Sequence, residues 1–169
     1  MFDAIARNSF KRGNAVIFAM RFTLMILAII ALAVPAIGQD QMILGPRQFE
    51  RDNSGRGAVL CIWAIYLSIQ AQTAHCGLAR RPVDDAIDEA IVAIDEFIIK
   101  NSSLRPTRRM LEDFKRRAAE SERSHFRQRG SYCENPDTER FRSIDADQLR
   151  AGVQQLLGIE REPVMNPCL

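Results

Sequence analysis

The segment that most restricts the fold of this chain is residues 58–74, which read as one helix that is apolar on nearly every side. Eight apolar side chains cover most of its circumference: Val59, Leu60, Ile62, Trp63, Ile65, Tyr66, Leu67 and Ile69. A helix of this kind is buried on most sides. The apolar run of about 12 residues is shorter than the ~20 that span a bilayer. A buried strand is the alternative, but the length and the polar tail favour a helix at the centre of a globular core.

Two of the four cysteines, Cys61 and Cys76, bracket this helix, and the other two are Cys133 and Cys168. A helix that joins Cys61 to Cys76 rises about 22 Å, whereas a disulfide needs Cα atoms about 4.4–6.8 Å apart. The first two cysteines therefore pair with the last two, as 61–133 and 76–168 or as 61–168 and 76–133. No CxxC pair is present, and we predict no metal site and no cofactor.

Residues 1–38 predict an export signal. Arg21 precedes an apolar run from Leu24 to Val34, and small residues, Ala36 and Gly38, stand where a signal peptidase reads. An uncleaved anchor is the alternative, although the run is too short to span a bilayer. The start, at Met1 or Met20, stays open. An even cysteine count after such a signal predicts disulfides in the periplasm, with membrane contact only through the signal segment.

The part that follows the signal divides into a polar arm and one domain. Residues 39–57 predict a flexible arm in which Met42, Ile43, Leu44 and Phe49 are able to dock, and residues 58–169 predict the domain. Residues 39–169 hold 19 basic and 20 acidic side chains. A net charge near −1 gives no general electrostatic reason to bind nucleic acid or an anionic membrane.

Further helices follow the central one. Residues 82–100 begin with Pro82 and repeat apolar side chains at helical spacing. Helices are also expected over 107–129, over a short turn from Pro136 to Phe141, and from a cap at Ser143 or Asp145 to Gly158. The sequence thus predicts an all-α fold, a compact bundle of four to five helices around the central apolar helix, held by two disulfides.

The chain offers no catalytic constellation, so we do not expect an enzyme. The serines lack a GxSxG context, and His75 and His125 have no obvious serine and acid partners. Acidic residues crowd the start of the helix at residue 82, either as a solvated helix end or as a patch that faces a basic partner. Tyr66 is either a core residue or an aromatic anchor beside Gln70. The candidate binding residues are Tyr66, Gln70, Asp84, Asp85, Asp88 and Glu89.

The layout and two short stretches, "SYCENPD" at 131–137 and "PVMNPCL" at 163–169, give the chain a resemblance to small helical periplasmic proteins of Rhizobiales. One such group resembles periplasmic inhibitors of lysozyme-type peptidoglycan hydrolases. The resemblance implies a domain that binds another exported protein and blocks its cleft, but no inhibitor residue carries over. Two alternatives remain. One is an enzyme or small-molecule binder around His75 and His125, with Glu122 and Tyr66, and the other is a chaperone or immunity protein for a secreted toxin.

Overall fold

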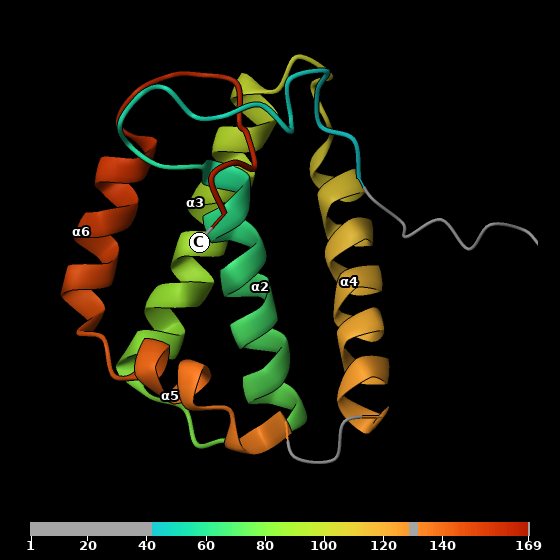
Figure 1. The fold of residues 1–169 in the computed structure, drawn as a ribbon, viewed down its shortest axis with the longest axis vertical. Coiled ribbons are helices and arrows are strands. Elements are labelled where there is room, and N and C mark those ends of the chain that lie inside the picture. The colour runs from blue at the N-terminus through green and yellow to red at the C-terminus, as the bar shows by residue number, and fades with distance from the viewer. Residues whose placement is uncertain (1–41, 129–131, 169) are drawn as a thin grey trace, which may run out of the picture. The chain divides into compact units, whose positions relative to one another are not determined.

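The all-α prediction is confirmed. The computed structural model describes residues 42–128 and 132–168, and the predicted signal peptide lies outside them. The described elements are α2 (Val59–His75), α3 (Pro82–Asn101), α4 (Arg108–Gln128), the 3₁₀ turn η1 (Tyr132–Glu134), α5 (Pro136–Arg142) and α6 (Ala146–Leu157) (Figure 1). None of the described helices combines the length and hydropathy that crossing a membrane requires.

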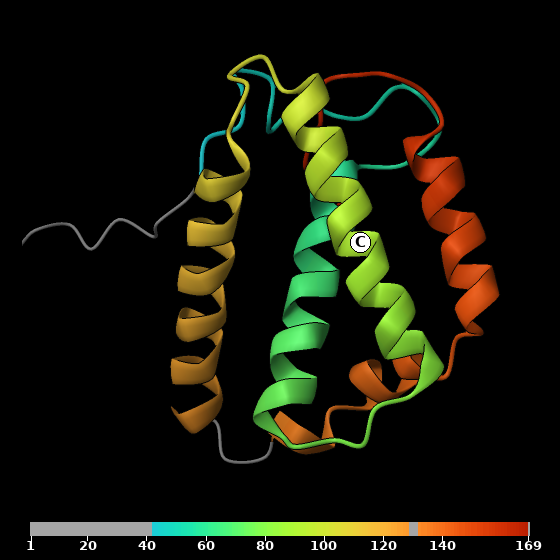
Figure 2. The ribbon, with the colours of Figure 1, turned by 180° about the vertical axis from the view of Figure 1, so that it is seen from behind.

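Helix α2 has neighbours on both sides, as its apolar circumference predicts. It packs against α3 and α4, and α3 packs in turn against α6. Figures 1 and 2 show α4 and α6 at opposite edges, with α2 and α3 between them. Trp63, Tyr66 and Ile69 of α2 are all buried. Leu111 and Phe126 of α4 are buried, and Phe114 of α4 stacks on Trp63 of α2 with ring centroids 5.4 Å apart.

The helix starts follow local chemistry that the sequence contains. Pro82 opens α3, and the Asp84 carboxylate accepts a hydrogen bond from the Arg81 backbone N–H (2.8 Å), one turn before it. Asp145 caps α6, because its side chain accepts from the N–H groups of Asp147 and Gln148 (3.0 and 2.9 Å). Such caps satisfy backbone donors that have no partner inside the helix.

Two disulfides attach the ends of α2 to the C-terminal third of the chain. Cys61, in the first turn of α2, bonds to Cys168 with a Cα–Cα distance of 5.2 Å. Cys76, the first residue after α2, bonds to Cys133 with a Cα–Cα distance of 5.6 Å. The expectation that Cys61 and Cys76 do not join each other is confirmed, and of the two open pairings the structure shows 61–168 with 76–133.

Residues 42–57 belong to the same compact unit as the helices, which begins at Met42 rather than at residue 58. Leu44 is 3% exposed, and the backbone carbonyl of Gln48 accepts from the Met165 N–H (2.7 Å). Asp52 pairs with Arg161 at 3.2 Å. Of the four side chains expected to dock, Leu44 is buried and Met42 is partly buried, whereas Ile43 and Phe49 are about half exposed.

Removal of the longer disulfide tests this architecture. We expect the double change Cys61→Ala and Cys168→Ala to lower the free energy of unfolding by about 2–5 kcal/mol, because the unfolded chain gains the freedom of a closed loop. Urea unfolding of the oxidised protein measures the loss. As a control, peptide mapping of the parent chain without reductant must recover the 61–168 and 76–133 disulfides. A urea midpoint that the double change leaves unaltered would contradict the expectation.

Candidate functional site

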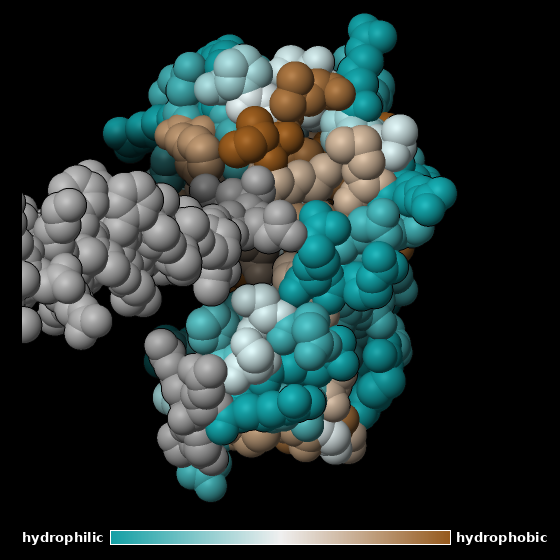
Figure 3. All heavy atoms as spheres, turned by 90° about the vertical axis from the view of Figure 1, so that its right-hand side faces the viewer, coloured by the Kyte–Doolittle hydropathy of each residue, from teal (hydrophilic) through white to brown (hydrophobic). Residues whose placement is uncertain are grey.

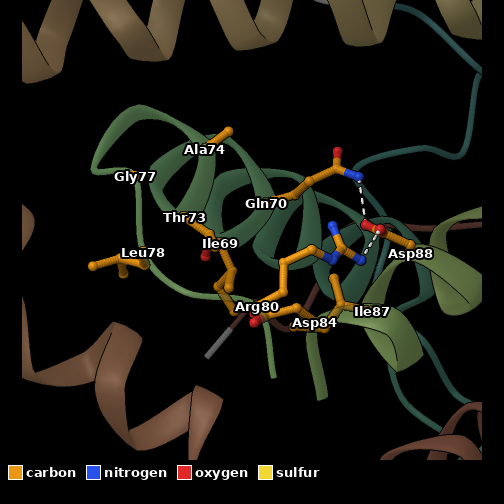
Figure 4. A pocket seen from close by; sticks show the side chains of 10 residues that line it. All are labelled: Ile69, Gln70, Thr73, Ala74, Gly77, Leu78, Arg80, Asp84, Ile87 and Asp88. Carbon is orange, nitrogen blue, oxygen red and sulfur yellow. Dashed lines mark hydrogen bonds and ion pairs between the residues drawn. The ribbon is translucent and has the colours of Figure 1, made fainter. Parts of the chain in front are cut away.

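Three of the six predicted binding residues, Gln70, Asp84 and Asp88, lie around one pocket. The pocket has a volume of about 330 Å³ and lies between the second half of α2, the loop 77–81 and the first turns of α3 (Figure 4). Its walls are formed by Ile69, Gln70, Thr73, Ala74, Gly77, Leu78, Arg80, Asp84, Ile87 and Asp88. We call it the α2–α3 pocket.

The other three predicted residues do not line this pocket. Tyr66 is a core residue that is 9% exposed, and burial raises the pKa of its hydroxyl. Asp85 lies on the outer side of α3, where it binds Arg80. Glu89 binds Arg150 of α6 at 2.7 Å. The structure therefore shows neither an exposed aromatic anchor at Tyr66 nor a set of unpaired acids.

The rim of the pocket is a preformed polar network. Gln70 donates from its amide to Asp88 Oδ1 (2.7 Å), and Arg80 donates from Nη2 to Asp88 Oδ2 (2.7 Å). Arg80 also donates from Nε to Asp85 Oδ1 (3.1 Å). Hydrogen bonds to Asp85 and Asp88 raise the pKa of Arg80, which therefore stays charged. Figure 4 shows Gln70 from α2 and Arg80 from the loop both reaching Asp88 of α3. Arg80 was not among the predicted site residues, although its place just before a helix that starts with several acids was a usable signal.

One wall of the pocket contains a buried ion pair. The Asp84 carboxylate accepts from Arg142 Nε (2.9 Å) and Nη2 (2.8 Å), and the two side chains are 6% and 2% exposed. Arg142 also donates to the Ala79 carbonyl at 2.6 Å. The hydrogen bond from Arg142 holds the pKa of Asp84 below its usual value, against the opposing effect of burial. The expectation of a solvated helix start is therefore wrong for Asp84.

Thr73 provides the pocket with an unusual polar group. Its hydroxyl oxygen is buried and has no hydrogen-bond partner within residues 42–128 and 132–168. Its neighbours Ile69, Leu78 and Ile87 give the pocket an apolar floor. Gly77, at φ +57°, allows the chain to turn back immediately after α2 and so closes one side. An apolar floor under a polar rim suits a group that is mostly apolar and carries one hydrogen-bonding atom.

The residues proposed for an enzyme site are not gathered around the α2–α3 pocket. Glu122 lines a separate pocket of about 180 Å³ between α2 and α4, together with Trp63 and Phe114. His75 is exposed, and its ring centroid lies 5.2 Å from that of Phe126. Tyr66, His75 and His125 line neither this pocket nor the α2–α3 pocket. Within the part of the chain that the structure describes, no group of three or more His, Cys, Asp or Glu side chains is placed to hold a metal ion.

Comparisons of the chain with protein-family models, with curated proteins and with solved structures give no significant match.

The buried ion pair gives a pH-dependent prediction. Asp84→Asn leaves Arg142 buried without its counter-ion, so the free energy of unfolding at pH 7 is expected to fall by about 3–5 kcal/mol. Because the pKa of Asp84 is lowered in the folded state, its contribution is complete above the ordinary aspartate value of about 3.9. The contribution is lost as the pH falls through the lowered pKa. Urea unfolding from pH 7 to pH 2 should therefore show the difference between parent and variant shrinking only at acid pH. A difference that is constant over this range would contradict the assignment.

The unpaired hydroxyl gives a second prediction. Thr73→Val removes a buried polar group that has lost its hydration, and we expect the free energy of unfolding to rise by about 1 kcal/mol. Thr138→Val is the matched control, because the buried Thr138 hydroxyl donates to Gln72 Oε1 and its loss should destabilise the protein. Thermal unfolding of both variants measures these changes. A lower free energy of unfolding for Thr73→Val would show that the Thr73 hydroxyl has a partner in the folded protein.

Proposed function

We propose that the chain is an exported binding domain that recognises another periplasmic protein, and that the α2–α3 pocket receives an apolar side chain of that partner. The observation that carries this proposal is the pocket itself, with an apolar floor under a rim of Gln70, Arg80 and Asp88. Protein interfaces draw most of their affinity from a few anchors that enter such pockets and are surrounded by polar contacts.

The size of the pocket and the hydrogen bonds of its rim favour this interpretation. At about 330 Å³ it stands near the lower limit of small-molecule sites, and it is large enough for a bulky side chain. The rim groups are already oriented by their hydrogen bonds to Asp88, so binding does not need to order them. Preorganisation of this kind reduces the entropic cost of association.

Support for export comes from the cysteines. Disulfides form and persist in oxidising compartments such as the periplasm, and both cysteine pairs lie at bonding distance. The apolar run after Arg21 supports the same location as a cleaved signal peptide over residues 1–38.

The resemblance noted above makes a lysozyme-type peptidoglycan hydrolase the first partner to test. Asp85, Asp88 and Glu89 are each paired with an arginine. Because their charges are compensated, these acids would orient a basic hydrolase in the complex more than they would attract it over a long range. Inhibition at a stoichiometric ratio identifies this partner. If no inhibition is observed, the hydrolase is excluded as the partner. The pocket can then still be tested with other exported proteins, including a secreted toxin.

A substitution at the edge of the pocket tests the binding site without disturbing the core. Ala74 lines the pocket and is exposed, so Ala74→Phe should reduce the space for a partner while the fold persists. The matched control is Ala151→Phe, at an exposed position of α6. We expect periplasmic proteins captured by the parent chain and by the control to be lost with Ala74→Phe. Capture of the same proteins by all three chains would place the binding site elsewhere.

A further inference from the structure

Three segments meet at the end of the domain opposite the α2–α3 pocket. They are residues 42–57, residues 102–110 and residues 158–168, and together they form what we call the loop end (Figures 1 and 2). Ser102 Oγ donates to the Leu44 carbonyl, and the Asp52 N–H donates to the Asn166 carbonyl (2.7 Å). Helix α2 starts at this end, and the pocket lies along its second half from Ile69 onwards, so the first half of the helix separates the two surfaces.

The loop end holds most of the large apolar side chains that the domain exposes. Among the described residues, six such side chains are between 41% and 55% exposed, and all except Val92 of α3 belong to the loop end. The five are Ile43, Phe49, Leu104, Met110 and Ile159. Figure 3, which looks onto the α4 side, shows hydrophobic residues gathered at this end. Exposed apolar side chains that are concentrated in one region indicate a surface that contacts something else.

The loop end is also basic. It contains seven arginines and four acidic residues, a net charge of +3, whereas the rest of residues 42–168 carries twelve basic and fifteen acidic side chains, a net charge of −3. Arg51, Arg56, Arg105 and Arg109 are exposed and form no ion pair with any described residue. Arg105 has φ +46°, a conformation that side-chain-bearing residues rarely adopt, so the loop retains backbone strain where it presents this arginine.

The chain also enters the domain through this end. Met42 belongs to the loop end, and only seven residues, 35–41, separate it from the apolar run Leu24–Val34. Seven residues reach at most about 25 Å when fully extended. While the run is still attached and in contact with lipid, the loop end is therefore within about 25 Å of the bilayer.

We propose that the loop end rests on a membrane surface of anionic phospholipids. The four unpaired arginines bind headgroup phosphates, and the five exposed apolar side chains enter the boundary between headgroups and acyl chains. Basic and apolar side chains on one surface are the combination by which proteins bind anionic membranes without crossing them. In this orientation the α2–α3 pocket faces away from the lipid, towards the compartment in which a protein partner diffuses.

Vesicle binding tests the proposal. The full sequence is expressed with its own export segment, and the disulfide-bonded, processed chain is recovered from the periplasm. Its partition into vesicles of mixed phosphatidylglycerol and phosphatidylcholine is compared with its partition into phosphatidylcholine alone. We expect binding only where phosphatidylglycerol is present, with a decrease as salt rises. Each arginine near the surface changes the partition coefficient about fivefold, so the triple variant R51Q/R105Q/R109Q should lose about 100-fold.

Two controls separate the loop end from general stickiness. Arg127→Gln removes an exposed arginine near the other end of α4, and Val92→Ser removes the exposed apolar side chain of α3. Neither should change the partition, whereas Leu104→Ser with Met110→Ser should reduce it several-fold. Equal binding by the triple variant and the parent would overturn the proposal. A complete lack of binding to the anionic vesicles would overturn it as well, and would leave the loop end as a surface for an acidic protein.

Discussion

Helix α2 is apolar around most of its circumference, and the rest of the domain is arranged to cover it. Helix α3 lies along one side of α2 and α4 along another. At the start of α2, the Leu60 N–H donates a hydrogen bond to the Val164 carbonyl at 3.1 Å. The two disulfides then join the start and the end of α2 to parts of the chain that are distant in sequence. A helix of this composition exposed on one side would leave a large apolar surface in water. Its burial therefore dictates where the other elements lie.

Two buried carboxylates of α3 determine how the neighbouring elements are oriented around this core. Asp95 accepts from Trp63 Nε1 of α2 at 2.9 Å and pairs with Lys115 of α4. Asp84 pairs with Arg142 at the end of α5. A buried ion pair contributes less to stability than its distances suggest, because both groups lose their hydration. It does, however, penalise any arrangement that separates the partners. In this domain the Asp84–Arg142 pair holds α5 against the wall of the α2–α3 pocket.

Local patterns in the sequence predict the helices well, and they place Gln70 and the acids of the following helix among the candidate binding residues. Helical spacing and capping residues act over a few positions, so they can be read directly from the chain. The burial of Asp84 could not be predicted in this way, because Arg142 is 58 residues away in the sequence. The pairing of Cys61 with Cys168 likewise depends on contacts between distant segments. The same is true of the packing of Leu44 and the core position of Tyr66. The absence of a free acidic patch has the same origin, since Glu89 finds its arginine on α6.

The two disulfides are nested, because the 57-residue span between Cys76 and Cys133 lies inside the 107-residue span between Cys61 and Cys168. Proteases that reach an exposed segment cut one peptide bond at a time. A single cut anywhere between Cys61 and Cys168 leaves the two fragments joined through sulfur, and a cut between Cys76 and Cys133 leaves them joined twice. The nicked chain remains one molecule, so its helices can stay packed together after a break in the backbone. This connectivity therefore keeps the two pieces of a nicked domain together without any added contact.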